Sequence, residues 1–155
     1  MNSFSKRALE LACENVEEGG HPFGAVLVSA GDVIAEGVNE LHKHPDVSGH
    51  AEMLAIRRAQ QKRGAVDLSD CVLYASGEPC SMCLTAIYFS GIQTVVYSQS
   101  VEEAAEAGLR LSGEVYDQIA RPKESRRITY EYEPVENESY NAMLLYAEKS
   151  AERER

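Results

Sequence analysis

Strand-like and helix-like segments alternate along the chain, and this alternation constrains the fold more than any other feature of the sequence. The segments that predict strands, apolar or alternating, span 23–29, 33–37, 71–76, 94–98 and 128–134. The segments with apolar residues at helical spacing span 3–16, 50–63, 77–91, 101–107, 112–120 and 138–148. Strands that alternate with helices are typical of an α/β fold, so we predict a largely parallel sheet covered by helices on both faces.

Length and charge narrow the class of protein. At 155 residues the chain is about one domain long, and we expect a single domain over residues 1–155 with no internal boundary. The formal net charge is −10, and Glu dominates the segment from residue 131 onward. A nucleic-acid binder needs positive charge facing the phosphates, so we expect no nucleic-acid partner.

The sequence predicts neither a membrane protein nor a secreted one. No apolar run reaches the roughly 18 residues that a membrane span needs, and residues 1–20 lack the apolar core of a signal peptide. We therefore expect a cytoplasmic protein that does not bind membranes. In a reducing cytoplasm structural disulfides are rare, and Cys-x-x-Cys spacing indicates metal or redox chemistry.

A pair of cysteines lies at the start of a predicted helix. Cys80 and Cys83, in the segment EPCSMC, are three residues apart, so on a helix they share one face and can chelate one ion. The start of a helix stabilises negative charge, which lowers the pKa of a thiol and favours the thiolate that metals bind. The spacing alone is compatible with either a metal site or a redox pair.

A histidine and a glutamate open another predicted helix, in the segment GHAEMLAI. His50 is the best candidate for a third metal ligand, because His42 and His44 lie in a polar loop. Two cysteines and one histidine are a ligand set of catalytic zinc, which keeps its fourth position for water. Glu52 is then near the metal without binding it and can take a proton from the water. Taken alone, His50 is equally interpreted as a helix-capping residue.

The two segments together form the signature of the zinc-dependent deaminases, His-x-Glu followed by Pro-Cys-x-x-Cys. The chain resembles the cytidine deaminase-like superfamily over nearly all of its length. The segments HPFGAVLV, AEGVNE, HAEMLAIRRA, LYASGEPCSMCLTAIYFSGI and AAEAGL are most similar to the bacterial guanine deaminase branch, and less similar to tRNA adenosine deaminases or free cytosine deaminases. The resemblance implies a three-layer α/β/α sandwich with a five-stranded mixed sheet, and a homodimer.

The resemblance also assigns roles to single residues of this chain. It implies zinc ligation by His50, Cys80 and Cys83, proton shuttling by Glu52, contact with the base by Asn39, a pocket lined by Phe23 and Ala51, and a departing amine near Glu78. From the residue types themselves, Asn39 is also typical of a turn after a hairpin, and Phe23 of plain core packing.

The chain departs from the guanine deaminase branch after the AAEAG stretch and at the C-terminal tail, where the usual aromatic end is missing and Tyr140, Asn141 or Tyr146 are candidates to replace it. In that branch the AAEAG-aromatic stretch is followed by an acidic residue that reads ring nitrogens, whereas this chain has Leu109, Arg110 and Leu111 there. Glu114, about one helical turn beyond Arg110, is a candidate for the missing carboxylate. The alternative is that Glu114 is an ordinary solvated helix residue.

These observations predict a zinc-dependent aminohydrolase that deaminates a small heterocyclic base, guanine-like or a related ring, and releases ammonia. Glu52 is expected to accept the proton of the attacking water and to deliver protons to the ring nitrogen and the leaving ammonia. Zn²⁺ is the expected cofactor, and no organic cofactor is required. A tRNA-specific adenosine deaminase, a cytosine or nucleoside deaminase, and a non-catalytic zinc-stabilised binding module remain as alternatives.

Overall fold

The computed structural model describes residues 1–154, which form two compact units. The first unit is Met1–Ala120, and the second begins at Arg121. The first unit contains the sheet and both predicted ligand-bearing segments, so it is the unit that positions the candidate site. The expectation of a single domain over residues 1–155 stays a prediction, and its last residue, Arg155, lies outside the described residues.

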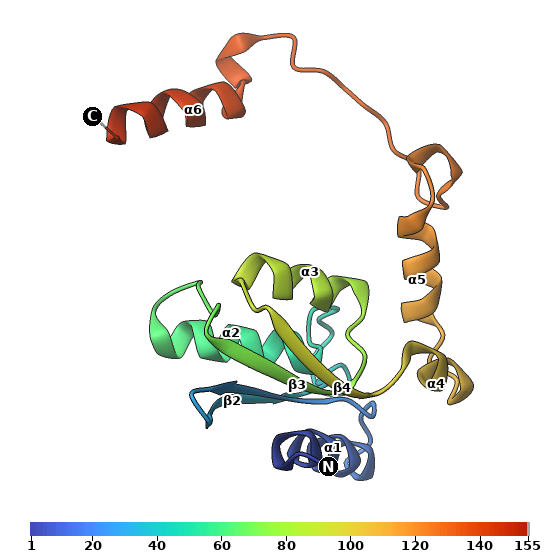
Figure 1. The fold of residues 1–155 in the computed structure, drawn as a ribbon. Helices are drawn as coiled ribbons and strands as arrows, with labels where there is room; N and C mark the ends of the chain where they lie inside the picture. The colour runs from blue at the N-terminus through green and yellow to red at the C-terminus, as the bar shows by residue number, and fades with distance from the viewer. Residues whose placement is uncertain (155) are drawn as a thin grey trace. The chain divides into compact units, whose positions relative to one another are not determined.

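The strands of the first unit form one mixed sheet (Figure 1). They are β1 (Gly24–Ser29), β2 (Asp32–Val38), β3 (Cys71–Gly77) and β4 (Thr94–Gln99). Their order is β2-β1-β3-β4; β1 is antiparallel to both of its neighbours, and β3 is parallel to β4. The α/β class and the mixed sheet are confirmed, whereas the expected largely parallel sheet is wrong. One cause is the hairpin turn at Gly31 (φ 83°), which makes β1 and β2 antiparallel.

Helices cover both faces of this sheet (Figure 1). The helices of the first unit are α1 (Ser3–Glu17), α2 (Ala51–Arg63), α3 (Ser81–Ser90), α4 (Val101–Glu106) and α5 (Leu111–Ala120). α1 lies on one face, and α2 and α3 lie on the other, which gives three layers. Among the described residues, no helix is both long enough and apolar enough to cross a membrane.

Each face of the sheet buries its own apolar cluster. On the α1 face, Leu11 packs with Val26 of β1. On the opposite face, a larger cluster joins β1 and β3 to α2, which contributes mostly small residues: Ala51, Ala55, Ile56 and Ala59. Burial of apolar surface, at about 25 cal/mol per Å², stabilises both contacts, and the small alanine side chains let α2 approach the sheet closely. This close approach fixes where the first turn of α2 lies.

The predicted fifth strand, residues 128–134, is not a strand in the structure, so the sheet has four strands within residues 1–154 instead of five. These residues belong to the second unit and are all exposed. Their alternation of apolar residues with Glu suits one face of a sheet, but a strand also needs a neighbouring backbone to satisfy its N–H and C=O groups. The second unit, as described, contains helical elements: η1 (Lys123–Ser125), η2 (Glu138–Tyr140) and α6 (Ala142–Arg153).

Capping residues account for several helix boundaries. α2 and α3 end at Gly64 (φ 66°) and Gly91 (φ 82°), which adopt the left-handed conformation that a side chain would strain. α6 begins at Ala142, later than the sequence predicted. The reason is that the Asn141 side chain accepts a hydrogen bond from the Leu144 amide and caps the helix there.

Substitution of Gly37 by alanine tests how tightly α2 is held against the sheet. A Cβ at Gly37 would clash with the Ala51 carbonyl oxygen and lie 3.0 Å from the Ala55 nitrogen, both of which are backbone atoms of α2. Gly37→Ala is therefore expected to lower the free energy of unfolding by about 1–3 kcal/mol, measured by urea denaturation.

Gly113→Ala is the matched control, because a Cβ there would lie 3.4 Å from Val101 Cγ1, an ordinary contact, and alanine is the better helix former. Its stability is expected to equal or exceed that of the wild type. Equal unfolding midpoints for the Gly37 and Gly113 variants would contradict the close packing of α2.

Candidate functional site

The two helix starts singled out in the sequence meet at the carboxyl end of β3. Cys80 is the N-cap residue of α3 (φ −67°, ψ 169°) and follows β3 by a short turn. His50 is the N-cap residue of α2 (φ −83°, ψ 153°). Neither side chain makes a capping hydrogen bond within the described chain, so both are available to other partners.

The three predicted metal ligands lie together. His50 Nδ1 lies 3.4 Å from Cys80 Sγ and 3.6 Å from Cys83 Sγ, and the two sulfur atoms are 3.6 Å apart. Zinc binds sulfur at about 2.3 Å and nitrogen at about 2.0–2.1 Å, so the edges of its tetrahedron are roughly 3.5–3.8 Å long. The three donor atoms therefore form a triangle of the size of one face of a zinc site.

The protonation of the two cysteines also suits a cation. The hydrogen bond with Cys83 lowers the pKa of Cys80 to about 4, against the opposing effect of burial and with a further contribution from His50. The contact with Cys80, together with burial, raises the pKa of the Cys83 thiol. The hydrogen bond between the two sulfur atoms thus favours one thiolate within the pair, and metal binding would release any proton that remains.

Glu52 is the second residue of α2 and is buried, with 4% of its surface exposed. Burial raises the pKa of its carboxyl group, while a hydrogen bond with Cys83 acts in the opposite direction. A buried carboxyl group with a raised pKa beside metal ligands is suited to proton transfer near neutral pH. Ala51, which precedes it, is fully buried and packs in the core.

Asn39 and Phe23 lie next to each other, because the Asn39 amide donates to the Phe23 carbonyl (3.2 Å). The Asn39 side chain is buried, and its Oδ1 accepts from the Leu41 amide (3.1 Å), which makes a turn. The turn role suggested by the residue type is therefore present. It leaves Nδ2, which has no protein partner among residues 1–154, as a donor for a ligand.

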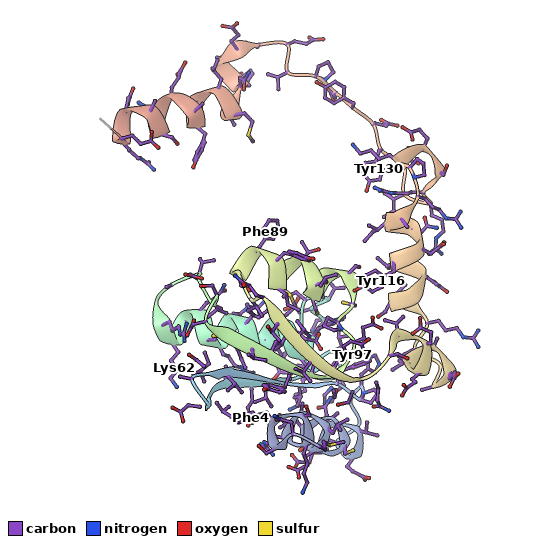
Figure 2. All side chains as sticks on the ribbon, viewed as in Figure 1. Phe4, Lys62, Phe89, Tyr97, Tyr116 and Tyr130 are labelled. Carbon is purple, nitrogen blue, oxygen red and sulfur yellow. The ribbon has the colours of Figure 1, made fainter. Side chains whose placement is uncertain are left out.

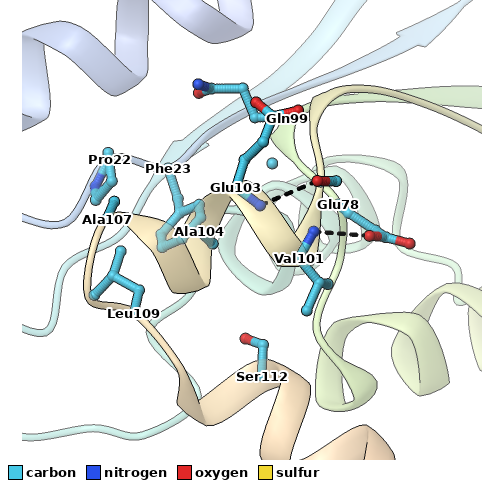
Figure 3. Close-up of a pocket in the computed structure, with 12 residues that line it drawn as sticks. Pro22, Phe23, Glu78, Gln99, Val101, Glu103, Ala104, Ala107, Leu109 and Ser112 are labelled. Carbon is cyan, nitrogen blue, oxygen red and sulfur yellow. Dashed lines mark hydrogen bonds between the residues drawn. The ribbon is translucent and has the colours of Figure 1, made fainter.

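A cavity of about 90 Å³ opens beside the turn that carries Glu78 (Figure 3). Its wall includes Phe23, Glu78, Leu109 and Ser112. Phe23 also packs against the core, as its residue type suggested, and its role in lining the base pocket stays a prediction. The Glu78 carboxylate accepts from the Val101 amide (2.9 Å), as Figure 3 shows. A cavity of this size has room for several water molecules.

The residues after the AAEAG stretch only partly follow the sequence prediction. Glu114, the candidate for the missing carboxylate, lies exposed in the first turn of α5, and Arg110 is exposed as well. The acidic residues in the cavity wall are instead Glu78 and Glu103. A role for Glu114 in binding the base stays a prediction.

The sequence analysis missed one residue that contacts the site. The Tyr116 hydroxyl of α5 (labelled in Figure 2) donates to the Pro79 carbonyl at 2.5 Å, directly before the candidate ligand Cys80. Burial, with the nearby Cys80 and Glu78, raises the pKa of Tyr116 to about 12, so the hydroxyl remains a donor at neutral pH. No local pattern could have found this contact, because it joins residues 37 positions apart.

Comparisons relate this chain to known proteins. Residues 1–99 match the cytidine and deoxycytidylate deaminase zinc-binding region. The chain is 48% identical over 129 residues to a guanine deaminase from Bacillus subtilis, which covers 83% of this chain and 82% of that protein. It is 34% identical over 136 residues to a tRNA-specific adenosine deaminase from Aquifex aeolicus, which covers 88% and 87%. An X-ray structure of guanine deaminase from Bacillus subtilis matches with a TM-score of 0.87 and 43% identity, covering 96% of this chain and 95% of that one.

Removal of both cysteine ligands tests the metal centre. Wild-type protein is expected to hold one zinc per chain, and the Cys80→Ala, Cys83→Ala double variant is expected to hold none, because the imidazole alone cannot retain the ion. Elemental analysis of dialysed protein gives the stoichiometry. Cys13→Ala is the control, since Cys13 is exposed and outside the triangle. Full zinc content in the double variant would show that the ion binds elsewhere.

Proposed function

We propose that this chain, which belongs to the cytidine and deoxycytidylate deaminase zinc-binding family, is a zinc-dependent aminohydrolase acting on a small, free, guanine-like base. The observation that carries the proposal is the zinc-sized triangle of His50, Cys80 and Cys83 with the buried Glu52 beside it. The choice of a guanine-like base is supported by the 48% identity to a guanine deaminase.

In this proposal His50, Cys80 and Cys83 hold Zn²⁺, which supplies a water of pKa near 7, acidic enough to react at neutral pH. The Glu52 carboxylate accepts the two protons of the attacking water in turn, giving the first to the ring nitrogen and the second to the departing amine. The amine-bearing carbon gains a C–O bond and loses its C–N bond, and ammonia leaves. The raised pKa of Glu52 helps the carboxyl group to hold the proton between these transfers.

Asn39 and Phe23 are proposed to position the base. Asn39 Nδ2 is a free donor for a ring acceptor, and Phe23 offers an aromatic face at the cavity wall. Ala51 and Glu78 complete the proposed pocket between the metal centre and the cavity. A small uncharged ring suits these contacts, and the net charge of −10 makes a polyanionic RNA substrate unfavourable.

We also propose a homodimer that acts in the cytoplasm without a nucleic-acid partner. Two neighbouring aromatic residues of α3, Tyr88 and Phe89, are 76% and 81% exposed, and Phe89 is labelled on this helix in Figure 2. Large exposed aromatic residues are typical of protein interfaces, which supports self-association.

Replacement of Glu52 by glutamine tests its role in proton transfer. Glutamine keeps the shape of the side chain but cannot accept the proton of the water, so kcat is expected to fall about 10²–10⁴-fold while zinc content and folding persist. Ammonia release at saturating substrate gives kcat. Glu10→Gln on the exposed side of α1 is the control and should keep full activity. Turnover of Glu52→Gln within a few-fold of the wild type would remove this residue from the mechanism.

A substrate panel tests the choice of a free base over RNA. We expect zinc-loaded protein to release ammonia from guanine or a related free ring in a panel of guanine, adenine, cytosine, aminated triazines, pterins and the matching nucleosides. Tight tRNA binding that weakens steeply with salt, with adenosine-to-inosine conversion and no activity on any free base, would support a tRNA-specific adenosine deaminase instead.

A further inference from the structure

The turn from Glu78 to Cys80 carries a metal ligand and is tied to the elements around it. The Glu78 amide donates to the Gln99 carbonyl at the end of β4 (2.7 Å). Its carboxylate accepts from the Val101 amide at the start of α4 (2.9 Å). The Cys80 carbonyl accepts from the Leu84 amide in α3 (2.8 Å). The ends of the turn are thus fixed by β4, α4 and α3.

Pro79, in the middle of the turn, is held by a fourth element. Its ring fixes φ, so ψ is the angle that sets the direction of its carbonyl and the position of Cys80 after it. The Tyr116 hydroxyl of α5 donates to this carbonyl at 2.5 Å. Pro79 is buried, so a carbonyl that lost this donor would be left without ready access to water. The hydrogen bond therefore holds the angle that places Cys80.

The same hydrogen bond anchors α5. Within Leu111–Ala120, which the structure describes in full, no residue is buried, and Tyr116 is only half-buried. α5 therefore has little apolar contact to hold it, and a hydrogen bond to a buried carbonyl matters more here than in a well-packed helix. α5 also carries Ser112, which lines the cavity with Leu109 just before the helix. Tyr116 thus connects one wall of the cavity with the turn that carries the metal ligand.

We propose that Tyr116 is a positioning residue for this site. Its hydroxyl orients the Pro79 carbonyl and thereby fixes the position of Cys80 relative to the cavity wall that α5 forms. Tyr116 acts through Pro79 and does not itself contact the substrate. Its effect on turnover rests on the proposed deaminase function, whereas its effect on metal retention does not. Loss of the hydroxyl should therefore loosen metal binding and slow the reaction without unfolding the chain.

Tyr116→Phe removes the hydroxyl and keeps the ring, and Tyr132→Phe makes the same change at a position that is 90% exposed and lies outside both the site and the proposed interface. Zinc content, the rate of zinc loss to an excess of chelator, the melting temperature, and kcat and KM on the best free base are measured for both variants and the wild type. We expect Tyr116→Phe to hold one zinc per chain, to lose it about tenfold faster, and to show about tenfold lower kcat with a smaller rise in KM, as expected for the loss of one hydrogen bond to a buried group. Tyr132→Phe should match the wild type.

The inference is overturned if zinc release and kcat of Tyr116→Phe equal those of Tyr132→Phe. It is also overturned if the losses disappear on cooling in step with a lowered melting temperature, because that result indicates only a general loss of stability. If the wild type deaminates no free base, the proposed function fails by itself. The rates of zinc release then still decide whether Tyr116 positions the metal-binding turn.

Discussion

The meeting of two helix starts at one sheet edge is the constraint on which the rest of the structure depends. His50 begins α2 and Cys80 begins α3, and their donor atoms must come within 3.4 Å of each other although 30 residues separate them. This requires both helices on the same face of the sheet, with α3 starting directly after β3. It also requires α2 to lie close to β2, where Gly37 leaves room for the backbone of the first turn. The small residues between α2 and the sheet therefore help to position the candidate metal ligands.

The charges at this meeting point explain why a metal suits it. The hydrogen bond with Cys83 lowers the pKa of Cys80 and favours its thiolate, and Glu52 is a buried carboxyl group whose pKa is raised by burial and by negative charge on Cys80. Two acidic groups close together in a poorly solvated place repel each other, and such an arrangement costs stability unless a cation or a proton offsets it. A dication bound by the triangle would relieve this repulsion. Metal binding and folding should thus be thermodynamically coupled, as they are wherever ligand groups are assembled by the fold.

Local signals in the sequence were sufficient for the elements of the first unit, whereas the metal triangle was predicted from the combined signature of His-x-Glu and Pro-Cys-x-x-Cys. Cys80 and Cys83 share a helix face by spacing alone, and Gly64 and Gly91 mark the helix ends because their φ values are positive. The prediction of a fifth strand was wrong because the alternation in residues 128–134 specifies which side chains share a face but not which strand they pair with, and pairing is a non-local property. The prediction of a largely parallel sheet was wrong partly for the same reason, because β1 pairs antiparallel with β3, and partly because the local turn at Gly31 makes β1 and β2 antiparallel. Which strands become neighbours depends on crossovers that no single segment encodes.

The residues beyond the AAEAG stretch show that the charge of a residue does not by itself indicate whether its side chain reaches the site. Glu114 drew attention because it is acidic and one helical turn away, yet it lies exposed, whereas the neutral Tyr116 reaches the metal-binding turn. In the cavity wall, the Glu78 carboxylate already accepts from a backbone amide and holds the start of α4. If neutral donors such as Asn39 Nδ2 carry most of the recognition, the proposed enzyme reads the ring chiefly by shape and a few hydrogen bonds. Shape alone discriminates between closely similar rings by only about 10–200-fold. The enzyme proposed here should therefore accept several related aminated bases, with the strongest selection against rings that leave the buried Asn39 donor unpaired.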